Sequence, residues 1–364
     1  MATDRTATRQ AHERGQSLWL DNITRTLLDD GTLARYIAEL SVTGLTSNPS
    51  IFDAAIGTGN TYDQSIRAKA QEGKSGEALF LALALEDLRR AADLFRPIHD
   101  ATNQRDGWVS MEISPLLASD TEGSLAAALH VHREARRPNL LVKIPGTSES
   151  IPAIEEAIFA GIPVNVTLLF SCNQYLTAAE AYLRGIERRI AAGLNPQILS
   201  VASLFVSRWD VAVSGKVPGD LHNTLGLAIC EQAFAAWHDL HRSERWQRLA
   251  AAGAVPQRLL WASTGTKDPL APDTMYVDAL VAPDTINTLP EKTLLAFADH
   301  GTVARAMSAD GKSARVVLDR FAKAGIDIEA LAVRLQQEGA QAFVKSWHQL
   351  LQRIADKSNA LAGD

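Results

Sequence analysis

One lysine lies inside a stretch of sequence that otherwise has the composition of a buried strand. Residues 140–142 (LLV) precede Lys143, and Ile144 and Pro145 follow it. A charged ammonium among apolar side chains is costly unless it is paired, neutral or reactive. Burial favours the neutral amine, which attacks carbonyl carbons to form a Schiff base. The alternative is a lysine whose stem packs while its head reaches water, the commoner role of an isolated lysine.

Two carboxylates occupy comparable positions in other apolar runs. Glu112, in SMEIS, suits general acid or base catalysis, directly or through one water, and it equally suits an ion pair with Lys143. Asp21, in LWLDN, is a second acid/base candidate. An Asp before a helical segment is also a common N-cap, although Asn22 offers another residue for that cap.

Further polar residues follow or interrupt the apolar runs. Asn165 and Thr167 are two residues apart, so they lie on one face of a strand and suit recognition of substrate hydroxyls. Arg208 follows SLFVS, where it suits a bidentate grip on phosphate, with an exposed helix-start arginine as the alternative. Asn48 lies in TSNPS, and Asn-Pro is also an ordinary turn signal. The other polar candidates at these positions are Ser203, Ser263 and Lys267.

Eight short apolar runs, separated by longer segments with helical periodicity, must position these side chains. The runs are residues 17–22, 42–47, 108–114, 140–145, 163–170, 198–206, 259–265 and 285–290. Nearly continuous apolar runs are typical of parallel strands that are covered on both faces. This alternation predicts an α/β fold, a (β/α)₈ TIM barrel, whose active-site groups gather at the carboxyl ends of the strands. An open doubly wound sheet is less favoured, because no glycine-rich phosphate motif follows the first run.

The chain is longer than a minimal barrel, and the extra length is helical in pattern. We predict one domain over residues 1–364, with an N-terminal helix near 7–16, a helical insertion near 221–252 and a C-terminal helical tail near 310–357. Neither an internal repeat nor a low-complexity linker divides the sequence.

Composition narrows the class of function. The net charge of −6 argues against nucleic acid and anionic membranes as partners, so any phosphate must be bound by a local site. The two cysteines, Cys172 and Cys230, build neither a disulfide framework nor a zinc site, and the nine histidines lack metal-binding spacing. The polar N-terminus lacks a signal-peptide core, and no apolar run approaches the ~20 residues of a membrane helix. We therefore predict a cytoplasmic protein without metal or cofactor.

Four segments, in order, are similar to the signature segments of the transaldolase family. They are TGLTSNPSIF, LVKIPGT, GIPVNVTLLFS and SLFVSRWD. The resemblance extends from LWLDN to the C-terminal helices. WASTGTKDP and YVDALVAPDTINTLP resemble the longer bacterial branch of the family.

This resemblance implies a metal-free barrel of the class I aldolase type. It would transfer a dihydroxyacetone unit from sedoheptulose 7-phosphate to glyceraldehyde 3-phosphate, in the non-oxidative pentose phosphate pathway. Lys143 corresponds to the Schiff-base lysine, Glu112 and Thr167 to the pair that holds a catalytic water, and Asp21 to the acid/base. The positions that correspond to substrate-binding residues are Asn48 and Asn165 for the three-carbon unit, Ser203, Phe205 and Ser263 in the pocket, and Arg208 and Lys267 for phosphate.

The sequence departs from the family pattern and leaves rival functions open. Lys267 stands near the place where other branches carry a second phosphate arginine, and VTGLTSNP lacks the acidic residue found at its start in some relatives. A fructose 6-phosphate aldolase would share the lysine, but relatives with that activity tend to carry tyrosine at the position of Phe205. A non-catalytic sugar-phosphate-binding barrel would need the polar residues without a nucleophile. We expect sugar phosphates as ligands and a monomer or homodimer.

Overall fold

Eight parallel strands pair in chain order and close into a barrel in the computed structural model, which describes residues 6–303 and 306–362. The predicted (β/α)₈ barrel is therefore confirmed, and a strand lies at each of the eight apolar runs. The strands are β1 (Ser17–Asp21), β2 (Val42–Thr46), β3 (Val109–Glu112), β4 (Leu140–Pro145), β5 (Val164–Leu169), β6 (Ser200–Phe205), β7 (Arg258–Ala262) and β8 (Ile286–Leu289). Almost every residue of these strands is buried, as expected where side chains face the barrel interior on one side and helices on the other.

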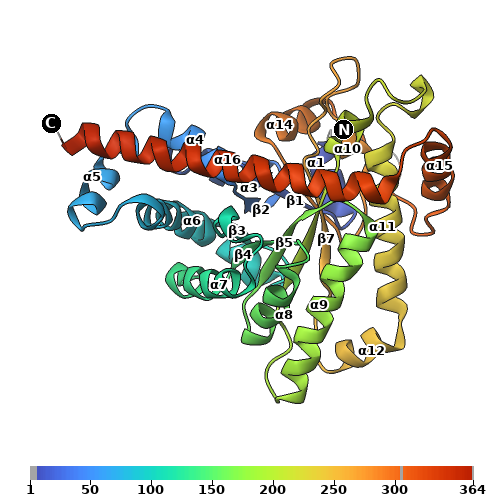
Figure 1. Ribbon diagram of the computed structural model, residues 1–364, viewed down its shortest axis with the longest axis horizontal. Helices are drawn as coiled ribbons and strands as arrows, with labels where there is room; N and C mark the ends of the chain where they lie inside the picture. The colour runs from blue at the N-terminus through green and yellow to red at the C-terminus, as the bar shows by residue number, and fades with distance from the viewer. Residues whose placement is uncertain (1–5, 304–305, 363–364) are drawn as a thin grey trace, which may run out of the picture.

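Helices connect the strands and cover the outside of the barrel (Figure 1). They are α2 (Arg25–Asp29), α3 (Thr32–Glu39), α4 (Pro49–Gly57), α5 (Asp63–Gln71), α6 (Gly76–Ala101), α7 (Thr121–Ala135), α8 (Ile151–Ala160), α9 (Cys172–Ala191), α10 (Ser207–Val213), α11 (Leu225–Arg242), α12 (Glu244–Ala251), α13 (Met275–Ala279) and α14 (Glu291–His300), with short 3₁₀ turns at Pro115–Leu117 and Gly219–Leu221. Ser171 and Gln174 form a capping box at the start of α9, and Gly161 ends α8 with a φ of +89°.

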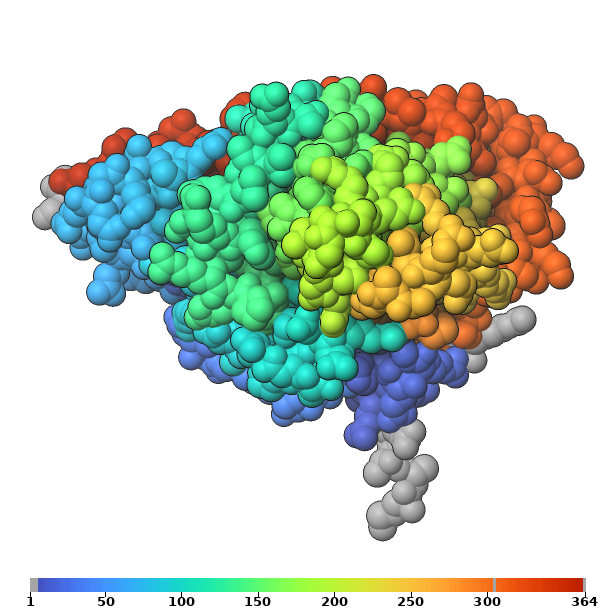
Figure 2. Space-filling model, turned by 90° about the horizontal axis from the view of Figure 1, so that it is seen from below, coloured from blue at the N-terminus to red at the C-terminus, as the bar shows by residue number. Residues whose placement is uncertain are grey.

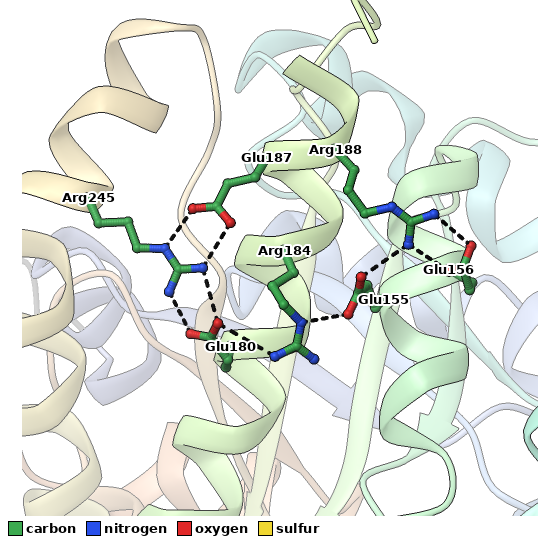
Figure 3. Close-up of polar contacts among 7 residues, drawn as sticks. All are labelled: Glu155, Glu156, Glu180, Arg184, Glu187, Arg188 and Arg245. Carbon is green, nitrogen blue, oxygen red and sulfur yellow. Dashed lines mark hydrogen bonds and ion pairs between the residues drawn. The ribbon is translucent and has the colours of Figure 1, made fainter. Parts of the chain in front are cut away.

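Residues 225–251, in the region predicted as a helical insertion, are α11 and α12, which connect β6 to β7. Arg245 of α12 donates to Glu180 at 2.6 Å and to Glu187 at 2.7 Å, and both carboxylates belong to α9. Two arginines of α9 bind carboxylates of α8 in turn (Figure 3). The full set is Glu155, Glu156, Glu180, Arg184, Glu187, Arg188 and Arg245. This chain of ion pairs fastens α12 to the outer helical layer.

The amino end of the barrel is filled by a buried polar network. Arg258 of β7 is only 3% exposed, and its Nη2 donates to Ser17 Oγ at 2.7 Å and to the carbonyl oxygen of Thr285 at 2.9 Å. Trp19 Nε1 donates to Asp106 Oδ1 at 2.8 Å beside it. Hydrogen bonds satisfy these groups, which burial would otherwise penalise. The polar residues singled out in the sequence lie toward the opposite, carboxyl ends of the strands.

Three helices lie outside the alternating pattern: α1 (Ala7–Glu13) before β1, and α15 (Lys312–Lys323) and α16 (Ile328–Ala362) after α14. The long α16 runs across the barrel and packs against α4, α5 and α6 (Figure 1). Figure 2 shows its red end beside the light-blue segment that includes α5. Trp347 anchors it, because its ring meets Phe80 edge-on at 5.1 Å and its Nε1 donates to Glu77 at 3.0 Å.

Candidate active site

Three of the predicted residues are direct neighbours across β3, β4 and β5. In the strand register, Glu112 pairs with Lys143, and Lys143 pairs with Asn165. Lys143 Nζ donates to Glu112 Oε2 at 3.2 Å and to the carbonyl oxygen of Ser47 at 3.3 Å. Lys143 is 6% exposed and Glu112 is 4% exposed, so this lysine does not extend into bulk water. Its charge is paired inside the barrel mouth, where a substrate carbonyl can reach the amine.

Asp21 does not cap the following helix, which was the alternative role that its sequence position suggested. Thr24 caps α2 instead, with its Oγ1 accepting from the backbone N–H of Leu27 at 3.1 Å. Asn22 does not cap α2 either, because its amide donates to Glu291 at 3.0 Å. Asp21 accepts a hydrogen bond from Thr46 Oγ1 at 2.8 Å and lines the cavity described below.

Both carboxyl groups have pKa values above the ordinary range. Burial raises the pKa of Asp21, and the nearby charge of Lys143 and the hydrogen bond from Thr46 partly oppose that effect. Burial also raises the pKa of Glu112, against the charge and hydrogen bond of Lys143, while the charge of Asp21 adds to the increase. A carboxyl group with a raised pKa accepts and returns protons more readily near neutral pH.

Asn165 is held in one orientation by its neighbours. Its Nδ2 donates to Ser110 Oγ at 3.1 Å, and its Oδ1 accepts from Ser203 Oγ at 2.7 Å. All three side chains are buried. The network joins β3, β5 and β6 at the level of Lys143, so the amide is positioned before any substrate arrives.

Two other buried oxygens near the lysine lack a hydrogen-bond partner among the described residues. They are Glu112 Oε1 and Thr167 Oγ1. Thr167 lies within an irregularity in β5, where the register with β6 shifts between Val166 and Leu169 and Leu168 has a φ of +59°. A positive φ is unfavourable for leucine, and such strain is often concentrated at functional sites.

A cavity of about 300 Å³ opens beside Lys143. All of the predicted site residues except Glu112 and Asn165 line it: Asp21, Asn48, Lys143, Thr167, Ser203, Phe205, Arg208, Ser263 and Lys267. Glu112 and Asn165 lie behind this lining, bonded to Lys143 and to Ser203. Residues from β1 to β8 that are distant in sequence therefore meet in one place, as the barrel prediction requires.

Two cationic side chains besides Lys143 line the cavity, Arg208 and Lys267. Arg208, the second residue of α10, is half-buried, and its guanidinium carbon lies 5.0 Å from the centre of the Phe205 ring. Burial lowers the pKa of Arg208, and the charge of Glu338 opposes this effect. Lys267 is exposed at the rim, in the segment after Ser263. The pair offers a half-buried guanidinium and an exposed ammonium to an anionic group.

Asn48 caps a helix instead of forming the Asn-Pro turn that its sequence context also suggested. Its Oδ1 caps α4 by accepting from the backbone N–H of Ile51 at 3.1 Å, and it also accepts from Ser50 Oγ at 2.6 Å. The same side chain lines the cavity. The cap fixes the side chain and leaves its amide N–H groups available to a ligand.

Several lining residues were not predicted. Thr46 and Thr288 share a hydrogen bond of 2.5 Å between β2 and β8, and strand alternation in VTGLTS and TINTLP was a signal that pointed to both. Phe343 comes from α16, and no sequence pattern relates that helix to the barrel mouth. The other unpredicted lining residues are Ser50, Leu260, Ala262, Gly265 and Pro290.

Neither a metal cluster nor a membrane helix is present in the described part of the chain. Within residues 6–303 and 306–362, no three His, Cys, Asp or Glu side chains gather as metal ligands. No helix in the same ranges has the length and apolar character needed to cross a membrane.

Fold and site together define a (β/α)₈ barrel with a lysine-centred cavity at the carboxyl ends of its strands. Residues 18–354 match the transaldolase/fructose-6-phosphate aldolase family. The chain is 43% identical to a transaldolase of Saccharopolyspora erythraea (95% of this chain, 96% of the relative) and 44% identical to one of Thermobifida fusca (96% and 97%). It is 38% identical to transaldolase 2 of Nostoc punctiforme (96% of both chains). The chain belongs to the transaldolase family, and the prediction of a transferase enzyme of this family is confirmed.

Proposed function

We propose that this enzyme transfers a dihydroxyacetone unit from sedoheptulose 7-phosphate to glyceraldehyde 3-phosphate, giving erythrose 4-phosphate and fructose 6-phosphate. The observation that carries the proposal is the buried contact between Lys143 Nζ and Glu112 in a cavity that also contains Arg208 and Lys267. The amine supplies the nucleophile, and the two cations suit the phosphate of each substrate. We assign this reaction to sugar-phosphate metabolism in the cytoplasm.

In the first half-reaction the amine of Lys143 attacks the ketone carbon of the donor, and loss of water gives a protonated Schiff base. Asp21 then takes the proton of the hydroxyl two carbons away, the carbon–carbon bond breaks and an aldehyde leaves. The electron pair of that bond is held as an enamine on Lys143. The raised pKa of Asp21 suits this step, because the same group must later return the proton.

In the second half-reaction the enamine carbon attacks the aldehyde of the acceptor. Asp21 protonates the new oxygen, and water adds to the carbon of the Schiff base. The carbon–nitrogen bond then breaks, which releases the product ketose and regenerates the free amine of Lys143. Glu112 Oε1 and Thr167 Oγ1 would hold the water for this step, and both atoms are buried without a protein partner among the described residues. Asn165 and Asn48 would fix the hydroxyls of the three-carbon unit.

Trapping the intermediate tests the proposal directly. Borohydride added with fructose 6-phosphate should leave a reduced three-carbon adduct on Lys143, located by peptide mass spectrometry. Lys143→Ala should show neither adduct nor transfer, while Lys345→Ala, which removes an exposed lysine of α16, should behave as wild type. An absent adduct, or normal turnover in Lys143→Ala, would overturn the mechanism.

A fructose 6-phosphate aldolase is the second candidate, and the family description names both activities. Phe205 favours transfer, because it stacks on Phe170 at 5.3 Å and offers no hydroxyl to the cavity. We expect slow cleavage of fructose 6-phosphate until erythrose 4-phosphate is added. Fast release of dihydroxyacetone without an acceptor would assign the enzyme to the aldolase activity.

A further inference from the structure

The C-terminal helix α16 is attached to the strands that carry the catalytic candidates. Gln336 Nε2 donates to the carbonyl oxygens of Gly146 at 3.0 Å and Leu168 at 2.9 Å. Gly146 directly follows β4, which contains Lys143, and Leu168 is the strained residue next to Thr167. One amide group therefore joins α16 to the ends of two neighbouring strands.

Gly339, one turn further along, allows α16 to lie directly on the site. A Cβ added at this glycine would be 3.0 Å from Leu168 Cδ2 and 3.2 Å from Arg208 Nη1. Glycine in a helix interior costs ~1 kcal/mol relative to alanine. Close approach to the guanidinium explains why the helix carries it here.

Phe343 completes this face of the helix. Residues 336, 339 and 343 are spaced by three and four, so they lie on one side of α16. Phe343 is half-buried, lines the cavity and places the centre of its ring 5.7 Å from Lys143 Nζ. An aromatic ring thus faces the nitrogen on which the proposed enamine would be held.

We propose that Phe343 is a specificity-determining residue that excludes water from the enamine, so that the three-carbon unit is transferred and not released. This inference rests on the proposed Schiff-base function. Release begins when a solvent proton adds to the enamine carbon. Water then adds to the Schiff-base carbon, the carbon–nitrogen bond breaks, and dihydroxyacetone and the free amine result. Transfer requires no proton on the enamine carbon. The water held by Glu112 and Thr167 would hydrolyse the Schiff base in both release and transfer. Protonation of the enamine carbon is therefore the step that occurs in release but not in transfer.

The test compares release with transfer in variants of Phe343. Phe343→Ala should raise the ratio of acceptor-independent dihydroxyacetone release to erythrose 4-phosphate-dependent transfer by about tenfold. In D₂O the released dihydroxyacetone should carry deuterium from the protonation step. Phe343→Gln, which keeps the length of the side chain but introduces a polar group, should also raise the ratio, and Phe343→Leu should restore a value near wild type. Val344→Ala is the matched control, because Val344 is the next residue of α16 and does not line the cavity.

The outcomes separate this inference from the proposed function. Absence of a borohydride adduct on wild-type Lys143 would remove the proposed function. An adduct and normal transfer in wild type, with an unchanged ratio in folded Phe343→Ala and Phe343→Gln, would overturn the role of Phe343 alone. An equal rise in Val344→Ala would also overturn it, because the effect would then come from general loosening of α16.

Discussion

Replacing Asn165 by alanine should affect stability and catalysis together, whereas the same change at Asn139 should affect stability alone. Both asparagines are fully buried, and both make two hydrogen bonds. Asn139 precedes β4 at the amino end of the barrel, where its Nδ2 donates to the carbonyl oxygens of Ala92 at 2.8 Å and Gly107 at 2.9 Å. The pair is therefore matched in chemistry and differs in distance from the site.

The size of the stability loss follows from these contacts. Each lost hydrogen bond costs ~1 kcal/mol, and the small cavity left by the side chain adds ~1 kcal/mol, so each variant should lose about 3 kcal/mol. An unfolding entropy of ~2.1 cal/mol/K per residue over 364 residues converts this loss to a fall in Tm of about 4 °C. Urea unfolding followed by tryptophan fluorescence measures the first quantity, and a thermal scan measures the second.

Transfer activity then separates the two variants under conditions where both are folded. Asn165→Ala releases Ser203 and removes the amide beside Lys143, so kcat should fall by about 100-fold, while Asn139→Ala should keep kcat within about twofold of wild type. Equal losses of kcat in both variants would refute the assignment of Asn165 to the site. A stability loss below ~0.5 kcal/mol in Asn165→Ala would refute the assumption that its two hydrogen bonds contribute to the free energy of unfolding.

Three further results are expected. Gly339→Ala should raise KM for phosphorylated substrates several-fold with little change in kcat, because its Cβ would push on Arg208; an unchanged KM would show that the guanidinium moves away freely. Asp21→Asn should abolish transfer and stabilise the fold at neutral pH. The folded state holds the Asp21 proton more tightly than the unfolded state, so the free energy of unfolding of the wild type declines as pH rises through the raised pKa of Asp21. In unfolding curves measured against pH, the difference in stability between variant and wild type should therefore shrink in acid. Arg245→Ala should cost ~1 kcal/mol or less in urea unfolding, with a smaller cost in high salt, and a loss above ~3 kcal/mol would mean that α12 had detached.

Strand periodicity was enough to predict that Lys143, Glu112 and Asn165 lie together at one end of the barrel. Lys143, Glu112 and Asn165 stood out because each is a polar residue at a position where the strand pattern requires an apolar one, and parallel strands align their carboxyl ends. Asp21 was ambiguous in sequence, and only the fold showed that Thr24, three residues later, is the cap. Local patterns therefore identify candidates, but they do not decide between two local roles.

The contribution of α16 was beyond sequence reasoning for a physical reason. Periodicity in residues 310–357 predicts helices, but an amphipathic stripe does not specify which surface covers it. Phe343 lies 200 residues after Lys143, and their contact joins segments that only the three-dimensional fold brings together. The same limit applies to residues 225–251, whose helical character was evident while their ion pairs with α9 were not.

The filled amino end of the barrel bears on the order of events in the proposed reaction. Arg258 and its partners occupy that end, so the cavity at Lys143 communicates with solvent on the side of the barrel that α16 crosses. In the proposed reaction, departing and arriving aldehydes would then pass through the same opening, and their phosphates would bind the same Arg208. Initial-rate plots against both substrates should consist of parallel lines, the pattern of a double-displacement enzyme. Excess acceptor should also inhibit the enzyme, because it occupies the free lysine form before the donor can bind.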